Sequence, residues 1–208
     1  MYVPKHFAEP DMEACHAFIR EYGFGVLIGV IDGAPFATHL PFLLDESRGS
    51  KGTLMAHMAR ANPHWRGFAA GGRSLVIFQG PHAYVSPSWY ATREKVVPTW
   101  NYVAVHAYGT PRINEDEGAS RAHLERLVAA QEAGRDPQWR LDSQPEGFIE
   151  SMVKGVVAFE LPIDTLEGKW KMSQNRAPED RTSAAAALAA SDDPLARAVA
   201  AMMTAGDG

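Results

Sequence analysis

Cysteine is almost absent from this chain of 208 residues, which contains Cys15 alone. An intrachain disulfide and a cysteine-based metal site are therefore both excluded. Cys15 lies in a segment with helical periodicity, where we expect a buried, unreactive thiol. Long apolar runs are also missing, because no stretch approaches the roughly 20 residues that a membrane-spanning helix needs. The first residues show no basic stretch followed by an apolar run, so we expect no signal peptide and a cytoplasmic protein.

An excess of positive charge is missing too. The formal net charge is −5, so the chain as a whole has no general attraction to nucleic acid or to an anionic membrane. The sequence also has no clear helix-turn-helix and no basic helix. Hydrophobic residues make up 46% and charged residues 22%, a composition typical of a globular protein whose length allows one sizeable core.

Common catalytic and metal-binding motifs are absent as well. The sequence contains no HExxH, no GxSxG and no Walker-type loop, and none of its eight histidines forms a helical i, i+4 pair with a carboxylate partner. We therefore predict no metal site. Gly23-Phe24-Gly25 lacks the third glycine of a dinucleotide loop and precedes a strand, the reverse of the required context. Gly25 and Gly29 better fit positions where a strand curves or a neighbour approaches closely.

Periodicity and turn chemistry predict the elements of the first half. A helix is expected from Asp11 to Tyr22, and Asp32-Gly33 between two apolar runs is typical of a hairpin turn. Asn62 and Pro63 suit the cap and first position of a short helix. Along the whole chain, strands are predicted at residues 23–31, 34–44, 53–59, 74–80, 84–86, 102–110 and 153–163.

Helical patterns dominate the second half. Asn114, with Glu117 three residues later, resembles a capping box at the start of a helix that reaches about Ala133. A short helix is plausible at residues 148–152, and the Ala-rich tail from Ser183 is helical, with a second start at Asp193-Pro194. We predict a mainly β fold with α additions (α+β), a barrel-like core and one domain over residues 1–208. A helical insertion lies at about 112–152 and C-terminal helices at about 178–203.

The stretch from Tyr84 to Tyr108 is the most distinctive part of the chain. Its 25 residues include two Trp, four Tyr, two Pro, two Ser and two Thr. Aromatic rings interleaved with hydroxyls and an amide suit a flat ligand with polar edges better than a plain core. This stretch therefore predicts one wall of a binding site.

Two further clusters add polar groups. In HMARANPHW, Arg60 precedes a helix start at Asn62, and an arginine beside a helix N-terminus is a natural anion site; the alternative is a surface arginine with a routine Asn-Pro cap. In KWKMSQNR, an extended backbone places Lys169, Lys171 and Ser173 on one face. That face is either a solvated strand edge or a surface rich in hydrogen-bond donors.

Taken together, the three clusters fit the parts of flavin mononucleotide (FMN). A phosphate needs charge-assisted bonds, the ring needs apolar faces, and its N1, C2=O and N5 edge needs donors. A nearby lysine would favour the anionic reduced flavin.

Four motifs occur in the following order along nearly the whole chain: MYVPKHF, HMARANPHW, VSPSWYATREKVVPTWNY and KWKMSQNR. In these four motifs the sequence resembles the PaiB-like family. Members of this family are described as FMN-binding negative transcriptional regulators. The resemblance implies a split β-barrel related to pyridoxamine-phosphate oxidase-like flavoproteins, and a homodimer with FMN at the subunit interface.

The resemblance also implies which residues hold the cofactor. Arg60 and Asn62 would lie on the phosphate side, with His57 beneath them. Neighbours of the ring and the ribityl chain would be Ser86, Ser88, Trp89, Tyr90, Thr99, Trp100 and Asn101. The pocket would be completed, from the same chain or from the partner chain, by Lys171, Ser173, Gln174, Asn175 and Arg176.

Three functions remain open at this point. The first is an FMN-binding regulator of the PaiB type that acts indirectly, since direct DNA binding is doubtful. The second is an FMN-dependent oxidoreductase of a small substrate. The third is a haem-binding or haem-degrading split-barrel protein. The C-terminal helices are interpreted as dimer packing rather than as a DNA reader.

Overall fold

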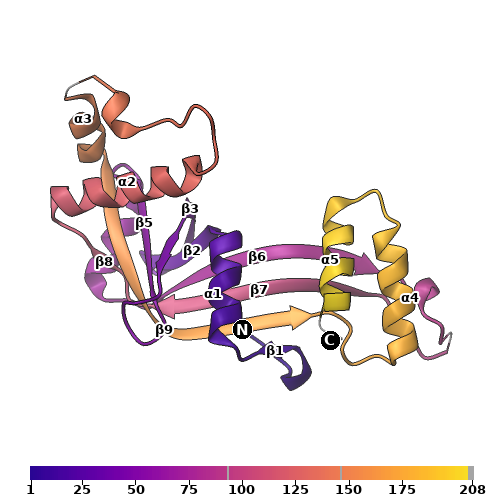
Figure 1. Cartoon of the computed structure of the whole chain (residues 1–208). Coiled ribbons are helices and arrows are strands. Elements are labelled where there is room, and N and C mark those ends of the chain that lie inside the picture. Colours follow the sequence, from indigo (N-terminus) through magenta and orange to yellow (C-terminus); the bar gives the residue numbers. More distant parts are fainter. Residues whose placement is uncertain (93, 146, 206–208) are drawn as a thin grey trace. The chain divides into compact units, whose positions relative to one another are not determined.

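The computed structural model describes residues 1–92, 94–145 and 147–205. The chain forms two compact units, each built from segments that are distant in sequence (Figure 1). The first unit comprises Met1–Phe18, Phe78–His106 and Glu167–Gly208, and the second comprises Ile19–Ile77 and Ala107–Leu166. The single domain over residues 1–208 remains a prediction. None of the described helices combines the length and apolarity needed to cross a membrane.

The first unit carries both ends of the chain. It begins with a 3-10 helix, η1 (Lys5–Phe7), and strand β1 (Ala8–Glu9), and it ends with two helices, α4 (Pro178–Ala189) and α5 (Pro194–Ala205). These two helices pack against each other and are drawn in orange and yellow in Figure 1. Four elements have residues in both units: α1 (Met12–Glu21), β6 (Ser74–Val85), β7 (Thr99–Gly109) and β9 (Val156–Lys171).

The second unit contains the predicted hairpin. Strands β2 (Phe24–Ile31) and β3 (Ala34–Pro41) pair antiparallel, and both turn residues, Asp32 and Gly33, take positive φ, as an Asp-Gly turn requires. Strand β5 (Thr53–Ala59) pairs with β9 on one side and with β4 (Leu43–Asp45) on the other. The second unit also contains η2 (Pro63–Ala70), β8 (Arg112–Ile113), α2 (Glu117–Glu132), η4 (Leu141–Ser143) and α3 (Phe148–Lys154).

The strand order is β3-β2-β6-β7-β9-β5-β4, with β1 and β8 also paired to β9. Among the described residues this path is open rather than closed into a ring. Every pairing whose register is given is antiparallel, and α2 and α3 fall within the predicted insertion. A mainly β fold with added helices is therefore confirmed.

Buried side chains lie on both faces of β5. Leu54, Ala56 and Met58 are buried on one face, and Thr53 and Met55 are buried on the other. Cys15 on α1 is buried, and burial, together with the carboxylates of Glu9 and Asp11, raises the pKa of its thiol to about 11. The prediction that Cys15 is buried is confirmed, and a thiol whose pKa is raised is a weak nucleophile at neutral pH.

Several predicted boundaries are wrong. Strand β6 continues through Gly80 and Pro81 to Val85, so the two strands predicted at residues 74–80 and 84–86 belong to one strand. Pro81 has no N–H group to donate, but it lies beyond residues 75–77, which pair with β2. Strand β9 likewise continues through Pro162 to Lys171, because its later residues gain a new partner in β1. The cap of α2 is Asp116, not Asn114, since its carboxylate accepts hydrogen bonds from the N–H groups of residues 118 and 119. Helix α4 begins at Pro178, before Ser183.

Candidate functional site

Most of the predicted cofactor residues lie in the first unit, whereas His57, Arg60 and Asn62 lie in the second. In the first unit, the aromatic stretch opens with a tight turn. Ser86 caps the 3-10 helix η3 (Pro87–Trp89) by accepting a hydrogen bond from the backbone N–H of Ser88 at 3.2 Å. The two serine hydroxyls lie 2.7 Å apart, so each has a partner before any ligand arrives.

Two tryptophans of this stretch line a surface pocket of about 320 Å³. Trp100 is 54% exposed, and its ring meets the exposed ring of Tyr84 edge-on at 6.0 Å. The pocket is lined by His82, Ala83, Tyr84, Trp89, Trp100, Leu188, Ser191, Asp193, Leu195 and Ala196. Exposed aromatic surface beside a concave wall is what a flat ligand needs.

Lys171 contacts Trp100, which lines this pocket. Its ammonium donates hydrogen bonds to the hydroxyl of Thr99 and, at 2.5 Å, to the backbone carbonyl of Trp100. Burial, with the positive charges of Lys169 and Arg176 nearby, lowers the pKa of Lys171 below the ordinary lysine value. A bound anion would relieve this repulsion.

Arg176 stacks over the ring of Tyr90 with 4.9 Å between the guanidinium carbon and the ring centre. Tyr90 is buried, and its hydroxyl has no hydrogen-bond partner among the described residues. A buried hydroxyl without a partner costs free energy, so a ligand that bonded to it would gain more than at an exposed site.

Other predicted residues of the first unit are already engaged within the chain. The amide of Asn101, which is fully buried, exchanges hydrogen bonds with the hydroxyl of Ser173 at 3.0 and 3.2 Å. The amide of Gln174 bonds to the backbone of Trp170 and Met172. These side chains shape the loop after β9, whereas Asn175 is exposed.

In the second unit, Asn62 is the predicted helix cap. Its side-chain oxygen accepts a hydrogen bond from the N–H of His64 at 3.0 Å, and its amide donates to Thr38 at 3.2 Å. The ring of His64 is buried against Gly29, where an added Cβ would lie 2.6 Å from Nε2. The prediction that Gly29 allows a neighbour to approach closely is confirmed.

Arg60 is bound to backbone carbonyls. Its Nε donates to the carbonyl of Lys154 at 2.8 Å and its Nη2 to that of Val156 at 2.9 Å. The side chain is exposed and borders a pocket of about 270 Å³. Of its five N–H donors, two are used, which leaves three for an anion.

His57 on β5 contacts His123 on α2. His57 Nδ1 and His123 Nε2 lie 3.3 Å apart, so one ring donates to the other. Burial, followed by the charges of His57 and Arg126, lowers the pKa of His123 to about 4. The pair is therefore neutral at physiological pH.

This depressed pKa predicts acid sensitivity. Because the pKa of His123 is near 6.5 when unfolded and about 4 when folded, the unfolded state binds more protons between these values. The free energy of unfolding should therefore fall by up to about 3 kcal/mol as the pH is lowered through this window. Urea unfolding at pH 7.5, 6, 5 and 4 would measure this fall. His123→Leu should show a shallower dependence, and an equal slope in both proteins would contradict the assignment.

Two residues near the predicted cofactor residues, Lys169 and His123, were not predicted to belong to the site. For Lys169 the sequence contains a signal, because Lys169 shares a strand face with Lys171. The ammonium of Lys169 lies over the rings of Tyr2 and Tyr102, at 5.6 and 5.1 Å from their centres. The contact between His57 and His123 joins residues 66 positions apart, and no local pattern predicts it.

An aromatic pocket with a lysine beside it, on an open antiparallel sheet with added helices, is typical of proteins that bind a flat cofactor. Residues 1–165 match the family described as "Putative FMN-binding domain". The chain is 37% identical to "Protease synthase and sporulation protein PAI 2" of Bacillus subtilis (strain 168) over 204 residues, which cover 98% of this chain and 96% of the relative. The chain belongs to the PaiB-like family of FMN-binding proteins.

Solved structures support the fold. A FAD and haem binding protein from Mycobacterium smegmatis superposes with a TM-score of 0.62 at 20% identity, covering 83% of this chain and 78% of its own. The flavocytochrome Anf3 from Azotobacter vinelandii gives 0.63 at 16% identity, covering 95% and 78%. The predicted split-barrel flavoprotein fold is confirmed.

The residues of the first unit fit FMN. The pocket of Trp89 and Trp100 offers faces for a flat ring, and Lys171 adjoins it as a cation without a carboxylate partner in the described part of the chain. The orphaned hydroxyl of Tyr90 offers a further polar contact. These are the kinds of groups that a flavin and its phosphate require.

Proposed function

We propose that FMN binds with its ring in the pocket lined by Trp89 and Trp100. The observation that carries this proposal is the juxtaposition of that aromatic pocket with the half-buried ammonium of Lys171. In this arrangement Tyr90, Ser86, Ser88 and Thr99 flank the ring and the ribityl chain. The donor side is formed by Asn101, Lys171, Ser173, Gln174, Asn175 and Arg176.

On the phosphate side we propose Arg60 and Asn62, with His57 beneath them. The support for Arg60 is its exposed guanidinium, which keeps donors after binding two carbonyls. Asn62 contributes less directly, because both ends of its side-chain amide are used within the chain. Its role is to hold the helix start whose N–H groups face the anion.

The proposal includes a homodimer with FMN at the subunit interface. A pocket of about 320 Å³ is at the lower end of the range of roughly 300–1,000 Å³ for small-molecule sites, which leaves part of a mononucleotide for a second copy to cover. Sedimentation of the FMN-loaded protein should give twice the mass of one chain. A monomer that retains FMN would rule out the shared site.

In the cell we infer a role as a negative transcriptional regulator that acts indirectly, through the flavin or a metabolite. The support is the similarity to the Bacillus subtilis protein named for protease synthesis and sporulation. Direct DNA binding is doubtful because the net charge is −5. A gel shift with upstream DNA that persists at physiological salt would contradict the indirect role. The cytoplasmic location stays a prediction.

A second candidate is an FMN-dependent oxidoreductase of a small substrate. The observation that favours it is Lys171, because an ammonium beside a flavin stabilises the anionic reduced form. When bound, FMN would supply hydride or electron transfer. Bleaching of the bound flavin by NADH or NADPH, followed by reoxidation with a substrate, would support this enzyme.

The visible spectrum of the purified protein, with and without added FMN, tests these functions together. Absorption bands of oxidised flavin that stay with the protein through gel filtration are the expected result. A Soret band after incubation with haemin would instead support haem binding. A colourless protein that ignores added FMN would overturn both flavin functions.

Arg60→Ala tests the phosphate side. Loss of a charge-assisted contact of roughly 1.5–3 kcal/mol should weaken FMN binding by about 10- to 150-fold. Riboflavin, which lacks the phosphate, should bind the variant and the parent protein equally well. Because Arg60 also bonds to two carbonyls, thermal unfolding must be measured alongside. Equal FMN affinity within about twofold would place the phosphate elsewhere.

A further inference from the structure

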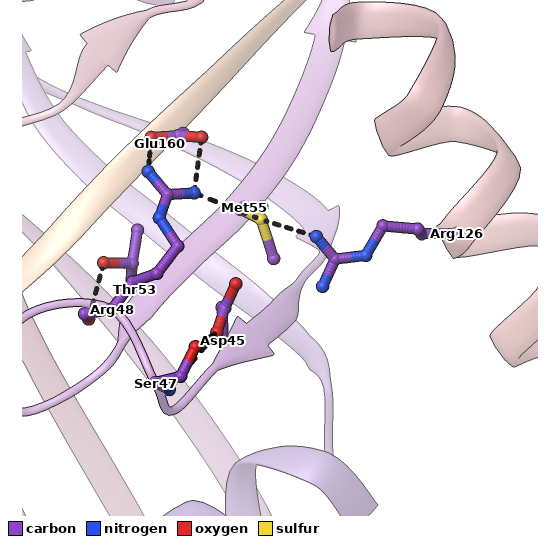
Figure 2. A network of polar contacts seen from close by, with 7 residues as sticks. All are labelled: Asp45, Ser47, Arg48, Thr53, Met55, Arg126 and Glu160. Carbon is purple, nitrogen blue, oxygen red and sulfur yellow. Dashed lines mark hydrogen bonds and ion pairs between the residues drawn. The ribbon is translucent and has the colours of Figure 1, made fainter.

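The second unit contains a smaller pocket that the cofactor proposal does not use. Its volume is about 180 Å³, and it lies where α2 faces strands β5 and β9. Its lining includes Arg48, Met55, His123, Arg126 and Glu160. Several of them form the polar network of Figure 2.

One arginine of this network is paired and the other is not. Arg48 donates two hydrogen bonds to the carboxylate of Glu160, at 2.8 and 2.6 Å. Arg126, which reaches in from α2, has one hydrogen bond among the described residues, to the sulfur of Met55 at 3.6 Å (Figure 2). A thioether is a weak acceptor, so Arg126 would give up this contact readily for an anion.

His123 supplies the second polar group. It is 8% exposed, its Nε2 contacts His57, and its Nδ1 has no partner in the part of the chain that the structure describes. His123 lines the pocket, whereas His57 does not. A buried nitrogen without a partner favours a ligand that bonds to it.

Charge and size define the ligand. The positive charges of Arg48 and Arg126 are matched by the negative charges of Glu160 and Asp45 (Figure 2). The carboxylate of Asp45 accepts a hydrogen bond from the hydroxyl of Ser47. A neutral cluster with two carboxylates nearby tolerates one further negative charge better than two. The volume corresponds to on the order of six water molecules, which suits a few non-hydrogen atoms.

We propose that this pocket binds a small monocarboxylate between the guanidinium of Arg126 and the Nδ1 of His123. The planar carboxylate matches the fork of the guanidinium and accepts from the imidazole with its second oxygen. The ligand then lies one side chain from His57, so its binding is positioned to influence the proposed phosphate side of the cofactor site.

Binding should be coupled to a proton. The groups around His123 are His57 from β5, Glu160 from β9, and Arg126 from its own helix. A bound carboxylate adds a negative charge that favours the imidazolium, so binding raises the pKa of His123 and takes up protons. Affinity should therefore increase as the pH falls from 7.5 to 5.5.

Acetate is the probe, with acetamide as its neutral isostere, titrated into the full-length protein at constant ionic strength. The ring protons of His123, assigned by their absence in His123→Gln, should shift and saturate with acetate but not with acetamide. Arg126→Met should weaken acetate binding at least tenfold. Arg121→Met is the matched control, because Arg121 on the same helix pairs with Glu125 and Glu150 and lies outside the pocket.

Two results would overturn the proposal. One is an equal response to acetate and acetamide, and the other is unchanged acetate affinity in Arg126→Met. Since the readout is the histidine signal and not the flavin, the outcome does not depend on the function of the FMN site.

Discussion

Methionine in place of Lys171 is expected to weaken FMN binding by about 10- to 150-fold. The ammonium is half-buried, lies beside Lys169 and Arg176, and is held by Thr99 and the carbonyl of Trp100 at the edge of the aromatic pocket. A cation held in this way is positioned for a charge-assisted bond to the ligand. Quenching of flavin fluorescence on titrating the apoprotein into FMN would measure the dissociation constant.

Three controls separate the charge from the scaffold. Lys171→Arg keeps the cation and should retain most of the affinity, whereas Lys51→Met removes a lysine from the loop between β4 and β5 and should leave binding unchanged. Thermal unfolding shows whether the lost bonds to Thr99 and Trp100 loosen the unit. If Lys171→Met folds normally and binds FMN within about twofold of the parent, Lys171 does not contact the cofactor.

Features that depend on neighbouring residues could be predicted from the sequence. The turn at Asp32-Gly33 needs positive φ at both positions, and the cap at Asn62 needs a short acceptor before Pro63. Such signals involve a few adjacent residues and hold whatever the rest of the chain does. They placed the hairpin, strand β5 and the start of η2 correctly.

Elements whose extent depends on distant partners could not be bounded in this way. Strands β6 and β9 pass through Pro81 and Pro162, residues that usually end a strand. Strand β9 continues because its two ends pair with different partners, β5 and β1. A single sequence does not contain that pairing in any local pattern.

The same division applies to the candidate site. The sequence placed Thr99, Trp100 and Lys171 in one predicted pocket, and their side chains and backbone do meet. It did not show that Asn101 and Ser173 satisfy each other, because that bond depends on the turn at Ser173, whose φ is positive. The sequence identifies donors, whereas the fold decides which remain available to a ligand.

Gly109→Ala is expected to destabilise the protein by about 3 kcal/mol or more. Gly109 ends β7, is buried and does not have positive φ, so its role is to save space. A Cβ there would lie 2.2 Å from the carbonyl oxygen of Pro162 and 2.7 Å from a methyl group of Leu161. The oxygen belongs to the backbone of a paired strand, so the clash cannot be relieved by a side-chain rotation, and overpacking of this kind costs roughly 1–3 kcal/mol even where side chains can adjust.

Gly72→Ala is the matched control, because an added Cβ at Gly72 meets no atom within 4 Å and the residue does not have positive φ. Denaturant unfolding should show this variant within about 0.5 kcal/mol of the parent. If the urea midpoint of Gly109→Ala were as high as that of Gly72→Ala, β7 and β9 could move apart at little cost in free energy. The close approach of these strands at Pro162 would then not be a fixed feature of the fold. A large loss confined to Gly109→Ala would instead tie the stability of the second unit to the point where these two strands touch.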